Sequence, residues 1–316
     1  MFTRVSIPTP FQVGAVNAYL AGRTVVDPGP DSEEAWSRLL EALEARELGP
    51  GDVEQVVVTH PHPDHFGLAA RLRDAGARVL ASPEGAAIMR DFPARLRYEQ
   101  DYFSDFFERC GLAAETAETV TQLPEAFLAY AESVETDREL DAGDTVTVDD
   151  EPLAVDAVAG HAEGERIFSY DHDGRREAVV GDNVLADITP NPFLQPPPAE
   201  GGERPRVLPA FNDSLRWLRE QGHDRFLTGH REPVESPVER IDAVLAEHDQ
   251  RTEAVADIVS GGATSPVDVM TGLFGDLPAT EYFSGLSEAV GHLDVLETQD
   301  RVRRREKGGV IVYELQ

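Results

Sequence analysis

The chain has 316 residues, of which 59 are acidic and 28 basic, and its formal net charge at pH 7 is −31. This acidity disfavours broad contact with nucleic acid, since phosphate binding relies on lysine and arginine. No stretch approaches the roughly 18 apolar residues of a membrane span, and residues 1–20 lack the pattern of a secretory leader. The single cysteine, Cys110, excludes an internal disulfide and a multi-thiolate zinc site. We therefore expect a cytoplasmic protein without membrane contact, in which nitrogen and oxygen atoms hold any metal.

The acidity also predicts a response to salt. Acidic side chains repel one another in a compact chain unless dissolved ions screen them. Lys307 is the one lysine, and the other basic residues are arginines. We interpret this balance as halophilic and expect the melting temperature to rise with KCl. Codon bias acting on an ordinary acidic protein is the alternative.

The first third of the chain predicts alternating strands and helices. Residues 17–29 form a strand and turn that ends at Asp27, and a helix follows over about 32–46. The β-branched run at 53–59 is typical of a buried strand. After a short loop, residues 66–76 indicate a helix that ends at a glycine.

Residues 84–138 have a different character and read as a helical insertion. They are acidic and contain no convincing strand. At helical spacing they carry one aromatic face, formed by Tyr98, Tyr102, Phe103, Phe106 and Phe107. Such a face usually packs into a core, and a lid over a substrate is the alternative.

Strand signals return at 144–148, 153–160, 167–182 and 224–230, with a hairpin turn at His172-Asp173-Gly174. The proline-rich stretch 188–198 must be a loop. From about residue 237 the pattern is helical again, and the chain ends in a predicted hairpin that turns at Gly308-Gly309.

The chemistry of the chain concentrates in one short loop. Three of the nine histidines and one aspartate fall within six positions after the buried strand, at His60, His62, Asp64 and His65. Two intervening prolines stiffen this loop, which lowers the entropy lost when its side chains are held in place. Three later positions share one context, because each follows a glycine at the end of an apolar strand: His161, Asp182 and His230. This pattern predicts a metal site of imidazole and carboxylate ligands.

These residues resemble the metallo-β-lactamase superfamily over nearly the whole chain. The matching positions are Asp27, the His-x-His-x-Asp-His motif at 60–65, and then His161, Asp182 and His230 in the expected order. The resemblance implies an α/β fold, the αββα sandwich. It also implies that His60, His62 and His161 bind a first metal and Asp64, His65 and His230 a second. Asp182 would bridge the two ions, and Asp27 would orient the ligand loop by hydrogen bonding without binding a metal itself.

The resemblance further implies a reaction. Two zinc ions would share a hydroxide, and Asp64 would act as the catalytic residue that orients the attacking water and accepts its proton. Iron and manganese also accept histidine with carboxylate, so they stay open. The family often has a further histidine four residues after the one matched by His161. This chain has Glu165 there, and we assign it no role.

Beyond the shared motifs, the C-terminal part resembles the winged-helix appendage of the β-lactamase-like protein 2 group. We therefore expect a catalytic domain at 1–236, interrupted by the insertion, and a small winged-helix-like α+β domain at 237–316. The glyoxalase-II-like relatives suggest a small-molecule ester, thioester or lactone as the substrate. An endoribonuclease acting on RNA is the alternative, a mononuclear iron enzyme like the persulfide dioxygenases comes next, and a non-enzymatic scaffold is last.

One basic cluster is compatible with an RNA partner. It lies on the predicted terminal hairpin and consists of Arg301, Arg303, Arg304, Arg305 and Lys307. A solvated face, or pairing with the acidic body of the chain, is the simpler interpretation. A homo-oligomer is left open. The four remaining histidines have no partners nearby in sequence and are expected at the surface: His172, His223, His248 and His292.

Overall fold

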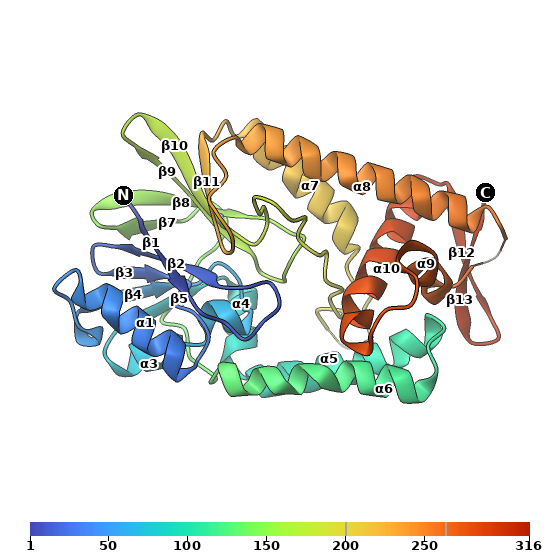
Figure 1. Ribbon diagram of the computed structural model, residues 1–316, viewed down its shortest axis with the longest axis horizontal. Coiled ribbons are helices and arrows are strands. Elements are labelled where there is room, and N and C mark those ends of the chain that lie inside the picture. Colours follow the sequence, from blue (N-terminus) through green and yellow to red (C-terminus); the bar gives the residue numbers. More distant parts are fainter. Residues whose placement is uncertain (200, 263) are drawn as a thin grey trace. The chain divides into compact units, whose positions relative to one another are not determined.

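The structure is a computed structural model that describes residues 1–199, 201–262 and 264–316 (Figure 1). By packing, the chain divides into two compact units, each made of three segments. Unit 1 contains residues 1–93, 126–190 and 218–240, and unit 2 contains residues 94–125, 191–217 and 241–316. Unit 2 thus takes in most of the helical insertion and of the proline-rich loop as well as the C-terminal segment, which a single boundary at residue 236 does not anticipate.

Unit 1 begins with a six-stranded sheet whose strands follow chain order. β1 to β3 pair antiparallel, whereas β3 to β6 pair parallel. The strands are β1 (Thr3–Ile7), β2 (Val16–Ala21), β3 (Thr24–Val26), β4 (Gln55–Val57), β5 (Arg78–Ala81) and β6 (Arg138–Glu139). One face packs against α1 (Glu33–Glu44), α3 (Ala69–Asp74) and α4 (Pro83–Arg90). The side chain of Ser32 caps α1 by accepting a hydrogen bond from the amide of Ala35, close to the predicted start.

The second sheet of unit 1 packs on the other face of the first. Its order is β11-β10-β9-β8-β7, with β10 and β11 parallel and the other pairs antiparallel. The strands are β7 (Thr145–Val148), β8 (Glu151–Ala157), β9 (Arg166–His172), β10 (Arg175–Gly181) and β11 (Arg225–Thr228). Val57 and Leu80 of the first sheet meet Phe168 and Val179 of the second in a shared core. The layered α/β fold is therefore confirmed, and its ligand-bearing loops follow strand ends.

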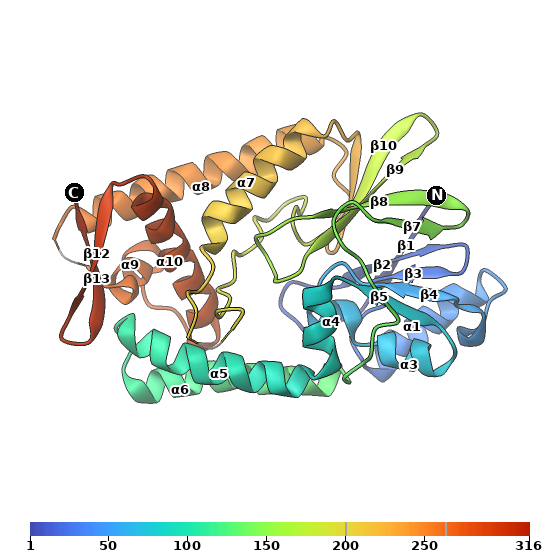
Figure 2. The same cartoon turned by 180° about the vertical axis from the view of Figure 1, so that it is seen from behind.

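Unit 2 is mainly helical and closes with a hairpin, as Figure 2 shows from behind. It contains most of α5 (Phe92–Arg109), of α7 (Val207–Glu220) and of α8 (Pro237–Val259). It also contains α6 (Ala114–Gln122), α9 (Pro266–Phe274), α10 (Tyr282–Thr298), β12 (Val302–Lys307) and β13 (Val310–Leu315). The hairpin turns at Gly308 and Gly309, as predicted, and both residues have a positive φ. The chain also contains short 3-10 helices: η1 (Pro50–Asp52) in unit 1, η2 (Leu123–Tyr130) across the boundary of the units in sequence, and η3 (Ala279–Glu281) in unit 2.

The aromatic face of α5 packs into the core of unit 2. Phe103, Phe106 and Phe107 are buried there, and Tyr102 packs against them. Tyr98 instead donates a hydrogen bond from its hydroxyl to the carbonyl of Pro197 at 2.7 Å. The packing interpretation of this face therefore holds.

Three of the histidines expected at the surface are buried, so that expectation was wrong. His223, His248 and His292 are each less than a tenth exposed, and only His172 is partly accessible. Most partners of these rings come from elements far along the chain, although Oε2 of Glu288 lies 3.3 Å from Nε2 of His292 within the same helix. Among the described residues, no helix is both long and apolar enough to cross a bilayer.

Candidate metal centre

The clustered motif occupies the loop and short helix that follow β4. His60 lies in the loop, His62 precedes the first residue of α2 (Pro63–Phe66), and Asp64 and His65 lie within that helix. The parallel strand delivers the loop to one edge of the sheet, and the backbone amide of Arg166 donates to the carbonyl of Thr59 at 2.8 Å. This bond ties the motif to the start of β9 in the second sheet.

The three later candidates arrive at the same place from the second sheet. His161 follows β8, Asp182 directly follows β10, and His230 follows β11. The glycine before His230 is required by space, because a Cβ at Gly229 would collide with the carboxylate of Asp182 and lie 2.7 Å from the ring of His65. The glycine before His230 is therefore explained by the close approach of the backbone to the site.

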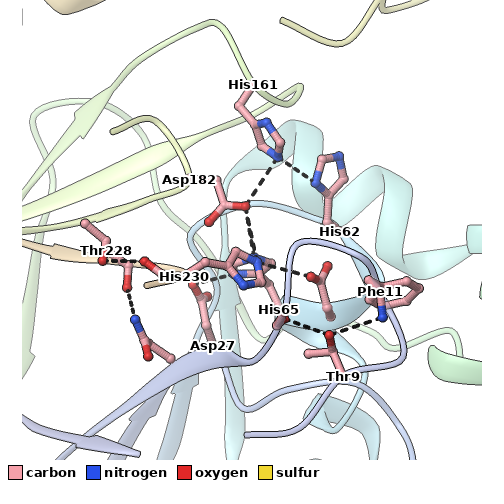
Figure 3. Close-up of polar contacts among 12 residues, drawn as sticks. Thr9, Phe11, Asp27, His62, His65, His161, Asp182, Thr228 and His230 are labelled. Atoms are coloured by element: carbon pink, nitrogen blue, oxygen red, sulfur yellow. Dashed lines mark hydrogen bonds and ion pairs between the residues drawn. The ribbon is translucent and has the colours of Figure 1, made fainter. Parts of the chain in front are cut away.

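The seven predicted residues all converge in unit 1. Their ligand atoms form three overlapping groups, and within each group the atoms lie within 4.8 Å of one another. The groups are His60 with His62 and His161, then His60 with His65 and Asp182, and finally Asp64 with His65 and His230. Figure 3 shows His161, His62, Asp182, His65 and His230 directed toward one another.

The first group has the spacing of metal ligands. Nδ1 of His62 lies 3.1 Å from Nε2 of His60 and 3.1 Å from Nε2 of His161. Nitrogens bound tetrahedrally to one zinc ion at about 2.0–2.1 Å would lie roughly 3.3 Å apart. One cation of that size therefore fits between these rings.

The carboxylates fill the space beside this group. Oδ2 of Asp182 lies 3.5 Å from Nε2 of His65, of His161 and of His230, and Oδ2 of Asp64 lies 3.3 Å from Nε2 of His230. Nε2 of His65, Nε2 of His230 and Oδ1 of Asp182 are buried and make no hydrogen bond. Buried polar atoms are rarely left unsatisfied, so this donor set fits divalent cations.

Three of the imidazole rings make a contact through Nδ1, the nitrogen that faces away from the centre. Nδ1 of His65 lies 2.9 Å from Oδ2 of Asp27, and Nδ1 of His230 lies 2.9 Å from the carbonyl oxygen of Ala15. Nδ1 of His60 lies 3.0 Å from Oγ1 of Thr59, whose hydroxyl donates to Asp27. In the neutral ring these contacts place the proton on Nδ1 and leave the lone pair of Nε2 facing the centre. Asp27 thus occupies the expected outer position.

The pKa values of the candidate ligands shift in two directions: those of His60, His62 and Asp182 are lowered, and that of His65 is raised. Burial and neighbouring histidines hold the pKa of His60 well below its ordinary value, and they lower the pKa of His62 to about 3. Burial disfavours the charged form of Asp182, yet His230 and His65 hold its pKa well below the ordinary value. Burial also opposes protonation of His65, but Asp182 and Asp27 raise its pKa. Metal binding requires neutral imidazoles and ionised carboxylates, so His60, His62 and Asp182 already have the required charge state, whereas a cation would have to displace a proton from His65.

Glu165 is a residue of the site that sequence reasoning missed. It is buried, and its Oε2 accepts hydrogen bonds from the backbone amide of His161 at 2.9 Å and from Nδ2 of Asn183 at 3.4 Å. Burial raises its pKa to about 8, against the effect of amide hydrogen bonds from Ala162 and His161. Glu165 therefore joins the two loops that carry His161 and Asp182. The signal was its position four residues after His161, where relatives often have histidine.

The basic cluster, for which nucleic-acid contact was the alternative interpretation, lies in unit 2, on or next to β12. Arg301 makes two hydrogen bonds with Glu253 at 2.6 and 2.8 Å, and Arg305 pairs with Glu314 at 2.7 Å. Two members of the cluster are therefore paired with the acidic surface. Arg303, Arg304 and Lys307 lie on the exposed faces of the hairpin.

Comparisons with known proteins agree with this geometry. The model of the metallo-beta-lactamase superfamily matches residues 12–230, a range that includes all seven candidate ligands. The chain is 30% identical to a probable metallo-hydrolase, YqjP, of Bacillus subtilis strain 168, over 98% of this chain and 96% of that protein.

Two solved structures share the architecture over the full length of the chain. A metallo-β-lactamase family protein from Thermus thermophilus aligns with a TM-score of 0.83 at 24% identity, covering 100% of this chain and 98% of the other. A β-lactamase domain protein from Burkholderia ambifaria aligns with a TM-score of 0.77 at 25% identity, covering 100% and 92%. The chain belongs to the metallo-β-lactamase superfamily, and the expected class of metallo-hydrolase is confirmed.

Proposed function

We propose that the protein is a dinuclear zinc hydrolase that cleaves a carboxylic ester, thioester or lactone. The observation that carries this proposal is the convergence of three overlapping ligand groups that share His60 and His65. His60, His62 and His161 would hold one ion, Asp64, His65 and His230 the other, and Asp182 both. When bound, a pair of such ions supplies activated water at neutral pH and polarises the bond under attack.

The protein's own contribution is orientation and proton handling. Asp64 contacts His230 through Oδ2, and among the described residues no arginine or lysine forms an ion pair with it. Burial opposes its charged form, but His65 and His230 hold its pKa below the ordinary value, so the carboxylate is ionised at neutral pH. As an ionised carboxylate Asp64 would orient the attacking water, and its lowered pKa makes it a weak acceptor for the proton of that water.

An RNA substrate is the second candidate because of the basic hairpin. Arg303, Arg304 and Lys307 would contact the phosphates. This second function also depends on the predicted resemblance of the C-terminal part to a winged helix. The ion pairs of Arg301 and Arg305 weigh against it, as does the charge of −31.

The experiment combines metal analysis with a substrate panel. The purified protein is assayed for zinc, iron and manganese, and then for hydrolysis of esters, thioesters, lactones and single-stranded RNA. We expect close to two zinc ions per chain and hydrolysis of one carbonyl class, which Asp64→Asn strongly reduces. One iron per chain with oxygen uptake would instead establish a dioxygenase, and RNA cleavage alone would establish the second candidate.

A further inference from the structure

An apolar surface in unit 1 lies on two segments that contact ligand-bearing elements, and it contains none of the candidate ligands. The helix η2 has the sequence LPEAFLAY, and none of its residues is buried. Phe127 is 37% exposed and the neighbouring Leu128 is 39% exposed. Large apolar side chains that gather at a protein surface mark binding sites more often than isolated ones do.

Phe11, from the loop between β1 and β2, completes this surface. Its ring lies edge-on to Phe127 at 5.1 Å between centroids and edge-on to Tyr130 at 5.6 Å. Edge-to-face contacts of this kind are a favoured arrangement of aromatic rings. We call Phe11, Phe127 and Tyr130 the aromatic patch. Its members come from two segments more than 100 residues apart in the sequence, and all three belong to unit 1.

Both segments are anchored on elements that carry candidate ligands. The loop of Phe11 ends at Ala15, whose carbonyl oxygen lies 2.9 Å from Nδ1 of His230. On the other side, a Cβ at Gly67, the residue after α2, would collide with the carbonyl of Tyr130. Figure 3 draws the turn from Thr9 to Phe11 in the same close-up as the ligand histidines. The two segments that carry the aromatic patch therefore contact His230 and the end of α2, both parts of the candidate metal centre.

The chemistry of the aromatic patch selects for an uncharged group. None of its three side chains carries a formal charge, in a chain whose net charge is −31. Burying methylene groups against aromatic rings is favourable in free energy. The rings carry no positive charge that could neutralise a phosphate. An acyl chain attached to a carbonyl held at the metals meets both requirements.

We propose that the aromatic patch binds the apolar acyl chain of the substrate, so that the enzyme prefers medium-chain over short-chain esters. This inference rests on the proposed ester hydrolysis. Full burial of one methylene group is worth about 0.8 kcal/mol, or roughly fourfold in kcat/KM. Partial cover of a six-carbon extension by the rings then gives a preference of at least about tenfold.

The test measures kcat and KM of the zinc-loaded protein on p-nitrophenyl acetate, butyrate and octanoate. In Phe11→Ala and Phe127→Ala we expect the octanoate-to-acetate ratio of kcat/KM to fall about tenfold, mainly through KM for octanoate. The matched control is Phe274→Ala. Phe274 lies in α9 of unit 2 and is 38% exposed, close to the value for Phe127, and its replacement should leave the ratio unchanged.

A binding measurement separates this inference from the proposed function. Calorimetric titration with sodium octanoate and sodium acetate should show tighter binding of octanoate, weakened about tenfold by Phe127→Ala. If octanoate binds in this way but no ester is cleaved, the proposed function fails and the aromatic patch stands. If esters are cleaved with the same chain-length preference in both variants, the aromatic patch is refuted and the function stands. A wild-type dimer that Phe127→Ala converts to a monomer in light scattering would also refute it, because a second copy would then cover the rings.

Discussion

Both units bury histidines beside a carboxylate, yet only one cluster has the features of a metal centre. In unit 2, Nδ1 of His248 lies 2.7 Å from Oδ1 of Asn212, and Nδ1 of His292 lies 2.8 Å from Oγ1 of Thr252. The carboxylate of that cluster, Glu288, accepts a hydrogen bond from Arg251 at 2.7 Å. Arginine already balances its charge.

The cluster of unit 1 has no such cation. Among the residues that the structure describes, Asp64 and Asp182 form ion pairs with histidines alone. A buried carboxylate without a permanent positive partner is costly, and a divalent cation removes that cost. A buried histidine is therefore a candidate ligand when its free nitrogen converges with other nitrogens on a carboxylate that no arginine or lysine neutralises.

The largest expected effect tests this comparison directly with matched substitutions. His230→Gln should remove bound metal and lower the rate of hydrolysis on the order of 10⁴-fold, because free water, with its pKa near 15.7, holds almost no hydroxide at neutral pH. His248→Gln replaces an equally buried histidine in unit 2 and should leave metal content and rate unchanged. Atomic absorption and steady-state kinetics measure both; equal metal loss in the two variants would break the comparison.

Removing the metals should destabilise unit 1 selectively. A ligand present at 1,000 times its Kd stabilises the folded state by about 4 kcal/mol. After treatment with a chelator, hydrogen exchange should therefore accelerate in β4 and β10 of unit 1. Exchange in α10 should change little. Uniform acceleration in both units would show that the metals stabilise the protein as a whole.

Acid should lower the stability of unit 2 through His248, in addition to its effect on the buried histidines of unit 1. Burial lowers the pKa of His248 to about 4. Below pH 6.5 the unfolded chain takes up a proton that folded His248 does not, so this stability is present above pH 6.5 and is lost as pH falls toward 4. The loss amounts to roughly 3 kcal/mol. Urea unfolding at several pH values should show a smaller acid loss in His248→Gln, and an unchanged pH dependence would exclude this role.

A smaller effect is expected at Glu165. Glu165→Ala leaves the amide of His161 and the side chain of Asn183 without this acceptor, and loss of such outer partners typically costs 10- to 100-fold in metal affinity. Glu165→Gln keeps an acceptor oxygen and should lose less. Competition with a chromogenic chelator measures the affinity. Wild-type affinity in the alanine variant would show that Glu165 does not position the ligand loops.

The effect of salt should not distinguish the two units. Because the charge of −31 is spread over the whole chain, screening by KCl or NaCl should raise the melting temperature steeply. The same hydrogen-exchange peptides would report it in both units. A melting temperature indifferent to KCl would remove the halophilic interpretation.

Much of the centre could be predicted from the sequence because its signals are local. His60, His62, Asp64 and His65 fall within six positions, and an apolar strand followed by a short loop puts such side chains at one edge of a sheet. The glycine-preceded positions and the turn at Asp173-Gly174 were readable for the same reason. These features depend on strand ends and backbone conformation, which nearby residues determine.

Tertiary structure alone decided the features that depend on contacts between distant segments. Glu165 acquires its partners only when the strands bring the loops of His161 and Asp182 together. His248 and His292 are buried because α7, α8 and α10 pack around them, and Phe11 meets Phe127 across more than 100 residues of sequence. Periodicity shows which residues a strand or helix buries, but it carries no information about which distant side chain will lie opposite.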